Sequence, residues 1–205
     1  MNKIINSIFL FKSSFLAVTI LLLQACSMGG QILKEADSLK TVTKDEVILV
    51  GTIELSPRLN KDEQHLDPSG VVDLFGYGDM NKNRAMIQFN ETPEVSDYKI
   101  MMNPELGKTF FFKVPRNMKY MVEGSILMEF SRYGNTGKIW LPIWFKVNIK
   151  PGDKAVYIGK LKYKRDDFNS VTNIELIDDY KNASKQFRKK FGTKYKLRKS
   201  LVNKI

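Results

Sequence analysis

A succession of short β-strand candidates, separated by turn-forming residues, is the feature that most constrains the fold of this chain. Runs rich in Val, Ile, Phe and Tyr recur after position 46, and Pro, Gly, Asn and Asp interrupt them, as turns interrupt strands. The runs predict strands at 47–55, 85–90, 98–102, 109–114, 120–131, 139–149, 155–163 and 171–177. Since no helical periodicity intervenes between them, we expect a mainly β fold, an antiparallel β-sandwich.

Turn signals support this reading at three places. The sequence YGNTGK at 133–138 predicts a hairpin, because Gly and Asn tolerate the positive φ angles of tight turns. Turns are also expected at 151–153 and 166–170, and Pro142 indicates an edge or a bulge within its strand. Residues 56–83 are rich in Pro, Gly, Asp and Asn and predict a long irregular connection.

One amphipathic helix is expected near the C-terminus. Asp178 and Asp179 suit a helix N-terminus, and Gly192 suits its C-terminal cap. Between them, apolar residues recur at near-helical spacing, and basic residues fall largely on the opposite side. The apolar residues are Tyr180, Ala183, Phe187 and Phe191.

The N-terminus has the three parts of an export signal. Lys3 and Lys12 supply positive charge, residues 15–23 form an apolar run too short to span a bilayer comfortably, and Leu23-Gln24-Ala25-Cys26 follows. This tetrapeptide resembles the lipobox of bacterial lipoproteins, which implies cleavage before Cys26 and attachment of lipid to it. Because Cys26 is the only cysteine, no disulfide is expected in the mature domain. Ser27 follows it where Asp commonly retains such proteins at the inner membrane, which favours the outer membrane.

A second resemblance concerns the mature domain. The stretch IKPGDKAVYIG at 149–159 resembles part of the prealbumin-like or immunoglobulin-like β-sandwich lipoproteins of bacterial envelopes. The resemblance implies a fold and carries over no functional residue. We therefore expect a signal peptide at 1–25, a lipidated Cys and flexible tether at 26–45, a β-sandwich domain at 46–177, and a basic C-terminal helix and tail at 178–205.

Charge is distributed unevenly along the chain. The formal net charge is +11, yet residues 26–180 carry 21 basic and 22 acidic groups. Residues 181–205, the cationic segment, carry ten basic groups and no acidic group. The segment either keeps the helix solvated or contacts polyanions, and its charge density favours contact. The expected contacts are Lys181, Lys185, Arg188, Lys189, Lys190, Lys194, Lys196, Arg198 and Lys199.

Catalytic and metal-binding patterns are weak. His65 is the only histidine and lacks the partner ligands or the nucleophile that a metal site or a hydrolytic triad needs. Residues 79–83 resemble the first half of a calcium loop, but Arg84 and Asn90 stand where the EF-hand pattern needs Gly and Glu. The glycines at 76 and 78 lack the spacing of a nucleotide loop. We expect no metal, no cofactor and no enzymatic activity.

Two groups of side chains have alternative explanations. The acidic pairs at 166–167 and 178–179 suit a turn and a helix cap better than paired catalytic carboxylates. The aromatic residues of the strands are expected mostly in the core, and stacking of sugars on Trp140 and Trp144, which share a parity, is the alternative. Phe110, Phe111, Phe112 and Phe145 belong to the same group.

These observations predict a lipid-anchored envelope protein that is a non-enzymatic binding module. Its ligand would be a polyanion such as lipopolysaccharide, a host glycosaminoglycan or an acidic host protein, contacted through the cationic segment. Nucleic acid is disfavoured by the compartment, and no small-molecule substrate is indicated. The alternative is a periplasmic structural or assembly lipoprotein that docks on another envelope protein.

Overall fold

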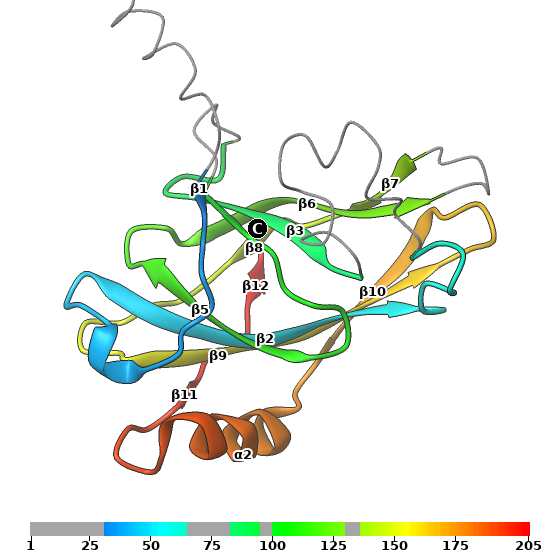
Figure 1. The fold of residues 1–205 in the computed structure, drawn as a ribbon. Coiled ribbons are helices and arrows are strands. Elements are labelled where there is room, and N and C mark those ends of the chain that lie inside the picture. The colour runs from blue at the N-terminus through cyan, green and yellow to red at the C-terminus, as the bar shows by residue number, and fades with distance from the viewer. Residues whose placement is uncertain (1–30, 65–82, 95–99, 130–135) are drawn as a thin grey trace, which may run out of the picture. The chain divides into compact units, whose positions relative to one another are not determined.

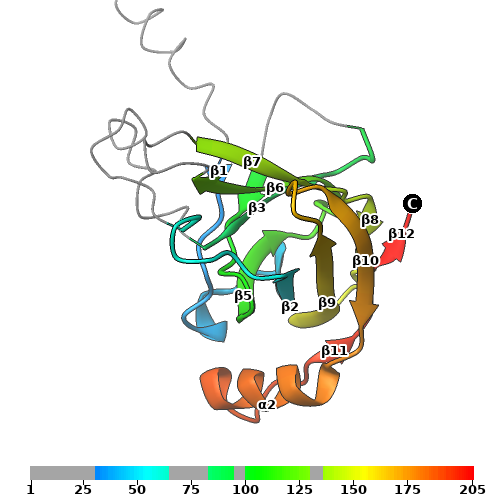
Figure 2. The ribbon, with the colours of Figure 1, turned by 90° about the vertical axis from the view of Figure 1, so that its right-hand side faces the viewer.

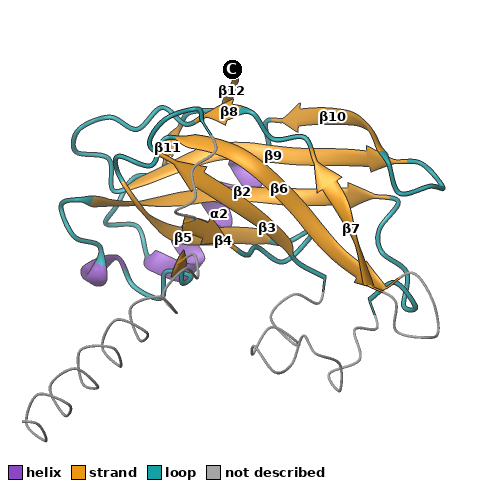
Figure 3. Ribbon diagram, turned by 90° about the horizontal axis from the view of Figure 1, so that it is seen from above, coloured by secondary structure: helices purple, strands orange, loops and turns teal. Residues whose placement is uncertain are grey.

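Two mixed β-sheets and one α-helix dominate the part of the chain that the computed structural model describes, residues 31–64, 83–94, 100–129 and 136–205 (Figures 1 and 3). The helix α2 spans Tyr180–Phe191, and a short 3-10 helix, η1, spans Leu39–Thr41. The strands are β1 (Gln31–Ile32), β2 (Glu46–Ser56), β3 (Ala85–Asn90), β4 (Ile100–Met102), β5 (Thr109–Pro115), β6 (Tyr120–Glu129), β7 (Thr136–Leu141), β8 (Phe145–Lys146), β9 (Ala155–Arg165), β10 (Val171–Ile177), β11 (Arg198–Lys199) and β12 (Asn203–Lys204). The prediction of a mainly β fold with a C-terminal helix is confirmed.

The strands are divided between a larger and a smaller sheet. Sheet A has the order β1-β4-β3-β6-β8-β12, with β7 also paired to β6, and sheet B has the order β10-β9-β2-β5, with β11 paired to β9. In Figures 1 and 2 the two sheets form two layers, and α2 lies against the outer side of sheet B. This arrangement is consistent with a β-sandwich-like fold.

Apolar side chains form two clusters. The first combines residues of both sheets, among them Phe89 and Ile126 of sheet A and Leu49 and Phe112 of sheet B. The second combines α2 with sheet B through side chains such as Phe187 and Tyr157. Strand β2 is therefore buried on both faces, which explains why its sequence is a continuous apolar run instead of an alternating one.

The expectation of purely antiparallel sheets is wrong. Most neighbouring strands are antiparallel, but β2 pairs with β9 in parallel, as do β1 with β4 and β11 with β9. Nearly one hundred residues separate β2 from β9, so no turn dictates their direction. The pattern of apolar residues in a strand does not depend on the direction of the neighbouring strand. It therefore does not distinguish parallel from antiparallel pairing.

The segment predicted as a flexible tether packs against the domain over the part that the structure describes. Leu33, Ala36, Leu39 and Val42 are buried, and the N–H of Ala36 donates to the carbonyl of Phe111 over 2.6 Å. The sequence of residues 31–45 is mostly polar and did not indicate this packing. Ala36, Leu39 and Val42 belong to the cluster between α2 and sheet B, and Leu33 belongs to the cluster between the two sheets. Residues 26–30, including Cys26, lie outside the described residues.

The end of the chain is also more ordered than the predicted tail. After α2, the chain adds β11 to sheet B and then β12 to sheet A, so its last residues connect the two sheets. Leu197 and Val202 are buried, and the N–H of Val202 donates to the carbonyl of Ile158 over 3.0 Å. Two-residue strands carry too little pattern to be recognised in a sequence dominated by lysine.

Most local predictions are confirmed. The residues at 151–153 and 166–170 form turns, with Gly152 and Asn169 at positive φ. The strand predicted at 139–149 is divided at Pro142 into β7 and β8, because proline has no N–H to donate to a neighbouring strand. Most of the predicted hairpin turn at 133–138 lies outside the described residues, although β6 and β7 on either side of it pair in antiparallel register.

Candidate functional site

Helix α2 is held at both ends by local hydrogen bonds. The N–H of Tyr180 donates to the carboxylate of Asp178 over 3.2 Å, and the N–H of Asp179 donates to the hydroxyl of Tyr157 over 2.8 Å. Burial raises the pKa of the Tyr157 hydroxyl to about 12. At the other end Gly192, at φ 81°, donates its N–H to the carbonyl of Arg188, a position that favours glycine.

The buried side of α2 fixes the rotation of the helix on sheet B. Phe187 is fully buried, and its ring centroid lies 5.1 Å from that of Phe191. Phe191 in turn meets Phe111 of β5 edge to face, at 5.4 Å. With this side turned inwards, the helical spacing directs the basic residues to solvent.

Four of these residues form the cationic face of α2: Lys181, Lys185, Arg188 and Lys189, all exposed. At about 100° of rotation per residue, the four lie on the same side of the helix. No acidic residue occurs in α2, and none of the four forms an ion pair with a residue that the structure describes. Unpaired cations on one surface sum to a positive potential that attracts anions.

Three other predicted contacts are ion-paired within the domain. The Nζ of Lys190 lies 3.7 Å from the carboxylate of Glu35 and 5.0 Å from the ring centroid of Phe111. The Nζ of Lys199 lies 2.8 Å from the carboxylate of Asp178. Charge along the sequence did not reveal these partners, because both acidic residues come from outside the cationic segment.

Arg198 forms the third and most extensive pair. Its guanidinium donates to both carboxylate oxygens of Asp153, over 2.8 and 2.7 Å. Burial acts to raise the pKa of this carboxyl, but hydrogen bonds from Arg198 and the N–H of Lys150, with the charges of Arg198 and Arg116, hold the pKa below its usual value. Arg198 therefore attaches the C-terminal strands to the turn at 151–153.

A groove of about 280 Å³ lies beside the cationic face, between α2 and the residues that follow it. Arg188 and Lys196 supply charge to its lining, and Ser184 and Thr193 supply hydroxyls. The guanidinium of Arg188 donates to the hydroxyl of Ser184 over 3.2 Å. Lys194 is exposed next to the groove. Cations and hydroxyl donors in one groove suit sulfate or phosphate groups.

The two tryptophans are exposed, which corrects the expectation that they belong to the core. Trp140 is 58% exposed and Trp144 is 49% exposed, whereas Phe110, Phe111, Phe112 and Phe145 are buried as expected. Both tryptophans lie on the exposed parity of a clear alternation from Ile139 to Phe145. The alternation was read correctly, but the sequence did not show which of its two faces lies against the other sheet.

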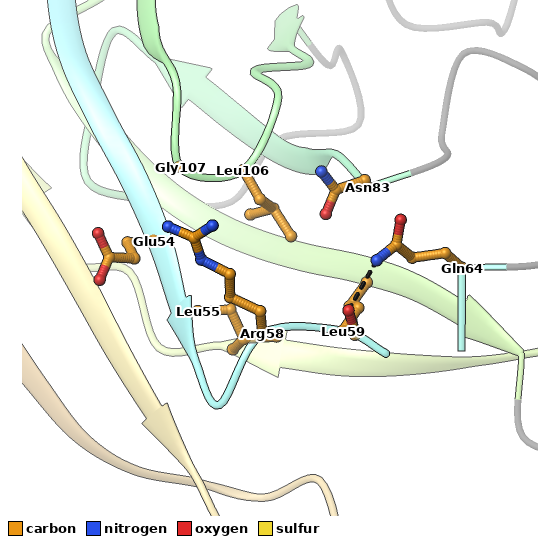
Figure 4. A pocket seen from close by; sticks show the side chains of 8 residues that line it. All are labelled: Glu54, Leu55, Arg58, Leu59, Gln64, Asn83, Leu106 and Gly107. Carbon is orange, nitrogen blue, oxygen red and sulfur yellow. Dashed lines mark hydrogen bonds between the residues drawn. The ribbon is translucent and has the colours of Figure 1, made fainter. Parts of the chain in front are cut away.

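A smaller cavity, of about 140 Å³, lies at the end of β2 (Figure 4). The side chain of Arg58 extends across it towards Leu106 and Gly107, and Gln64 donates to the carbonyl of Leu59 over 2.7 Å. Its size is well below the roughly 300–1,000 Å³ of typical ligand pockets.

An ion pair that the sequence did not indicate holds the segment carrying Arg58. The side chain of Arg165 is only 5% exposed and lies 2.7 Å from one carboxylate oxygen of Glu63. The hydrogen bond from Arg165 holds the pKa of Glu63 below its usual value. Arg165 also donates to the carbonyls of Pro57 and Arg58, both over 3.1 Å. This pair secures residues 57–63 against β9.

The remaining candidates have structural roles or fall outside the described residues. Asp166 accepts N–H donors of its own turn, from Phe168 and Ser170, both over 2.9 Å. His65, the glycines at 76 and 78 and most of the calcium-like sequence at 79–83 are not among the described residues. Within the described ranges, no three His, Cys, Asp or Glu side chains are placed to hold a metal ion.

Fold and site together define a mainly β domain that presents a cationic helix. No helix in the described part of the chain is long and apolar enough to cross a membrane. Comparison of the chain with protein-family models, with curated proteins and with solved structures found no significant match.

Proposed function

We propose that this chain is a lipid-anchored envelope protein that binds polyanions through the cationic face of α2 and the adjoining groove. In this proposal Cys26 carries the lipid, the two sheets pack as a β-sandwich, and the domain acts as a binding module and not as an enzyme. The outer membrane is the proposed location. Lipopolysaccharide, sulfated glycans and acidic protein surfaces share the required chemistry, which is closely spaced negative charge.

The observation that carries the proposal is the selective pairing of cations. Lys190, Arg198 and Lys199 have acidic partners in the domain, whereas Lys181, Lys185, Arg188 and Lys189 face solvent without one among the described residues. Solubility alone would not require the solvent-facing side of the helix to carry four cations and no acidic residue. The polyanion site is therefore narrower than the cationic segment, and consists of the cationic face with Lys194 and Lys196.

The helical arrangement suits a linear or planar polyanion. Residues at i, i+4 and i+8 of a helix are spaced about 6 Å apart along its axis, and Lys181, Lys185 and Lys189 have this spacing. A ligand with regularly repeated sulfates or phosphates can therefore engage several cations at once. The contacts release counterions, so the affinity should fall steeply as the salt concentration rises.

The test is elution of the full-length, detergent-solubilised protein from heparin resin in a salt gradient. The fourfold variant Lys181→Gln, Lys185→Gln, Arg188→Gln and Lys189→Gln should elute at much lower salt. By analogy with nucleic acid, where each neutralised phosphate contributes roughly 0.7–0.9 to the slope of log affinity against log salt, the slope should fall by about three. Binding to lipopolysaccharide should decrease in parallel.

A matched control separates a specific site from total charge. Lys40, Lys44, Lys61 and Lys119 are exposed and lie outside both α2 and the lining of the groove. Their simultaneous replacement by Gln changes the net charge by the same amount and should leave most of the retention on heparin. Equal loss of retention in both variants would show that net charge, and not the cationic face, determines binding.

A further inference from the structure

The outer face of sheet A carries a hollow that differs in chemistry from the cationic face. Its volume is about 100 Å³. Exposed Trp140 lines it, and the other lining side chains supply the amide of Gln88, the hydroxyl of Ser125, the carboxylate of Glu123 and the ammonium of Lys138. The thioethers of Met86 and Met101 and the backbone of Gly124 complete the lining.

The strand register places these residues in two neighbouring rows. Trp140 of β7 is opposite Ser125 of β6, which is opposite Met86 of β3. In the next row Glu123 is opposite Gln88, which is opposite Met101 of β4. The side chain opposite Trp140 is the small Ser125, and the indole is 58% exposed.

The charges around Trp140 restrict the ligand. The Nζ of Lys138 lies 5.4 Å from the centroid of the indole, where its positive charge opposes a cationic ligand that would use the same ring. A carboxylate, that of Glu123, also lines the hollow, so the lining contains groups of both charges. A lining of mixed charge favours an uncharged ligand that combines an apolar face with hydroxyl or amide groups.

We propose that this hollow binds a neutral oligosaccharide, with one sugar ring stacked on Trp140. The negative face of an indole attracts the positively polarised C–H groups of a pyranose, while the hydroxyls of the sugar meet the polar groups around Ser125 and Lys138. The hollow is far smaller than the roughly 300–1,000 Å³ of enclosed ligand sites. It therefore serves as an open platform for an internal unit of a chain and does not enclose a free monosaccharide. This site is independent of the polyanion site.

The experiment is titration of full-length, detergent-solubilised protein with chitohexaose, cellohexaose and maltohexaose, followed by calorimetry. We expect at least one of these neutral hexasaccharides to bind. Trp140→Ala should weaken its binding about tenfold or more, and Trp140→Phe should restore part of it, since a phenyl ring also stacks. Ser125→Leu, which fills the hollow and leaves Trp140 in place, should weaken binding as well.

The control is Phe168→Ala, because Phe168 is 89% exposed and lies on the turn after β9, outside the hollow. This variant should bind like the unmodified protein, and circular dichroism should show that every variant is folded. The proposal is overturned if none of the three hexasaccharides binds, or if Trp140→Ala and Phe168→Ala bind equally well. It is also overturned if Trp140→Ala dissociates an oligomer, which would assign the hollow to a second copy of the chain.

Discussion

Replacement of Phe187 by Ala should separate the stability of α2 from that of the sheets. Phe187 is fully buried in the cluster between α2 and sheet B, which is distinct from the cluster shared by the two sheets. Loss of a buried Phe side chain costs about 3–5 kcal/mol, because transfer free energy is lost and a cavity remains. Since a typical domain is stable by only about 5–15 kcal/mol, this is a large fraction of the total.

The expected result is detachment of the helix before unfolding of the sheets. A helix of 12 residues is marginal in water without tertiary contacts. Urea denaturation monitored by far-UV circular dichroism should therefore show a weaker helical signal and a loss of about 3–5 kcal/mol in the stability of α2. Amide protons of β3 and β6 should remain protected from exchange while those of α2 exchange faster.

The matched control is Phe168→Ala, which removes the same side chain from an exposed position and should change stability by less than about 0.5 kcal/mol. Retention on heparin should decrease in Phe187→Ala, since the cationic face depends on a docked helix, and should be unchanged in Phe168→Ala. A loss of less than about 1 kcal/mol in Phe187→Ala, with the helical signal intact, would refute the reasoning that Phe187 docks α2.

Three further predictions concern other parts of the chain. Asp153→Asn should cost about 2 kcal/mol at neutral pH, because it weakens the hydrogen bonds from Arg198. The pKa of Asp153 is lowered in the fold, so this stabilisation is present above about pH 4, the unfolded value, and is lost as the pH falls through the lower folded value. Melting temperatures of the two proteins should therefore differ at neutral pH and converge in acid, and equal melting temperatures at neutral pH would show that the pair contributes nothing. Gly159→Ala should destabilise by about 2 kcal/mol or more, since Gly159 has φ +111° and a Cβ atom would lie 2.5 Å from Leu176; an unchanged melting temperature would contradict this. Cys26→Ala should abolish labelling with palmitate and release the protein from membranes, and retained labelling would exclude Cys26 as the residue that carries the lipid.

The sequence determined the local elements of this protein. Alternation and turn residues located β3 and β10 at the same bounds that the structure shows, and located β5 and β9 within two residues. The apolar spacing from Tyr180 to Phe191 and the glycine at 192 located α2. These features depend on neighbours in the chain, whose preferences and spacing are written in consecutive residues.

The tertiary structure decided which surfaces and charges remain available. It paired β2 with β9 in parallel, attached the last residues to both sheets, and turned Trp140 to solvent. It also placed Glu35 next to Lys190 and Asp153 next to Arg198, so that some cations of the segment have acidic partners while those of the cationic face have none among the described residues. Such outcomes depend on contacts between residues far apart in sequence, because a lysine or a tryptophan has the same local pattern whether its partner is an acidic side chain, a neighbouring sheet or water.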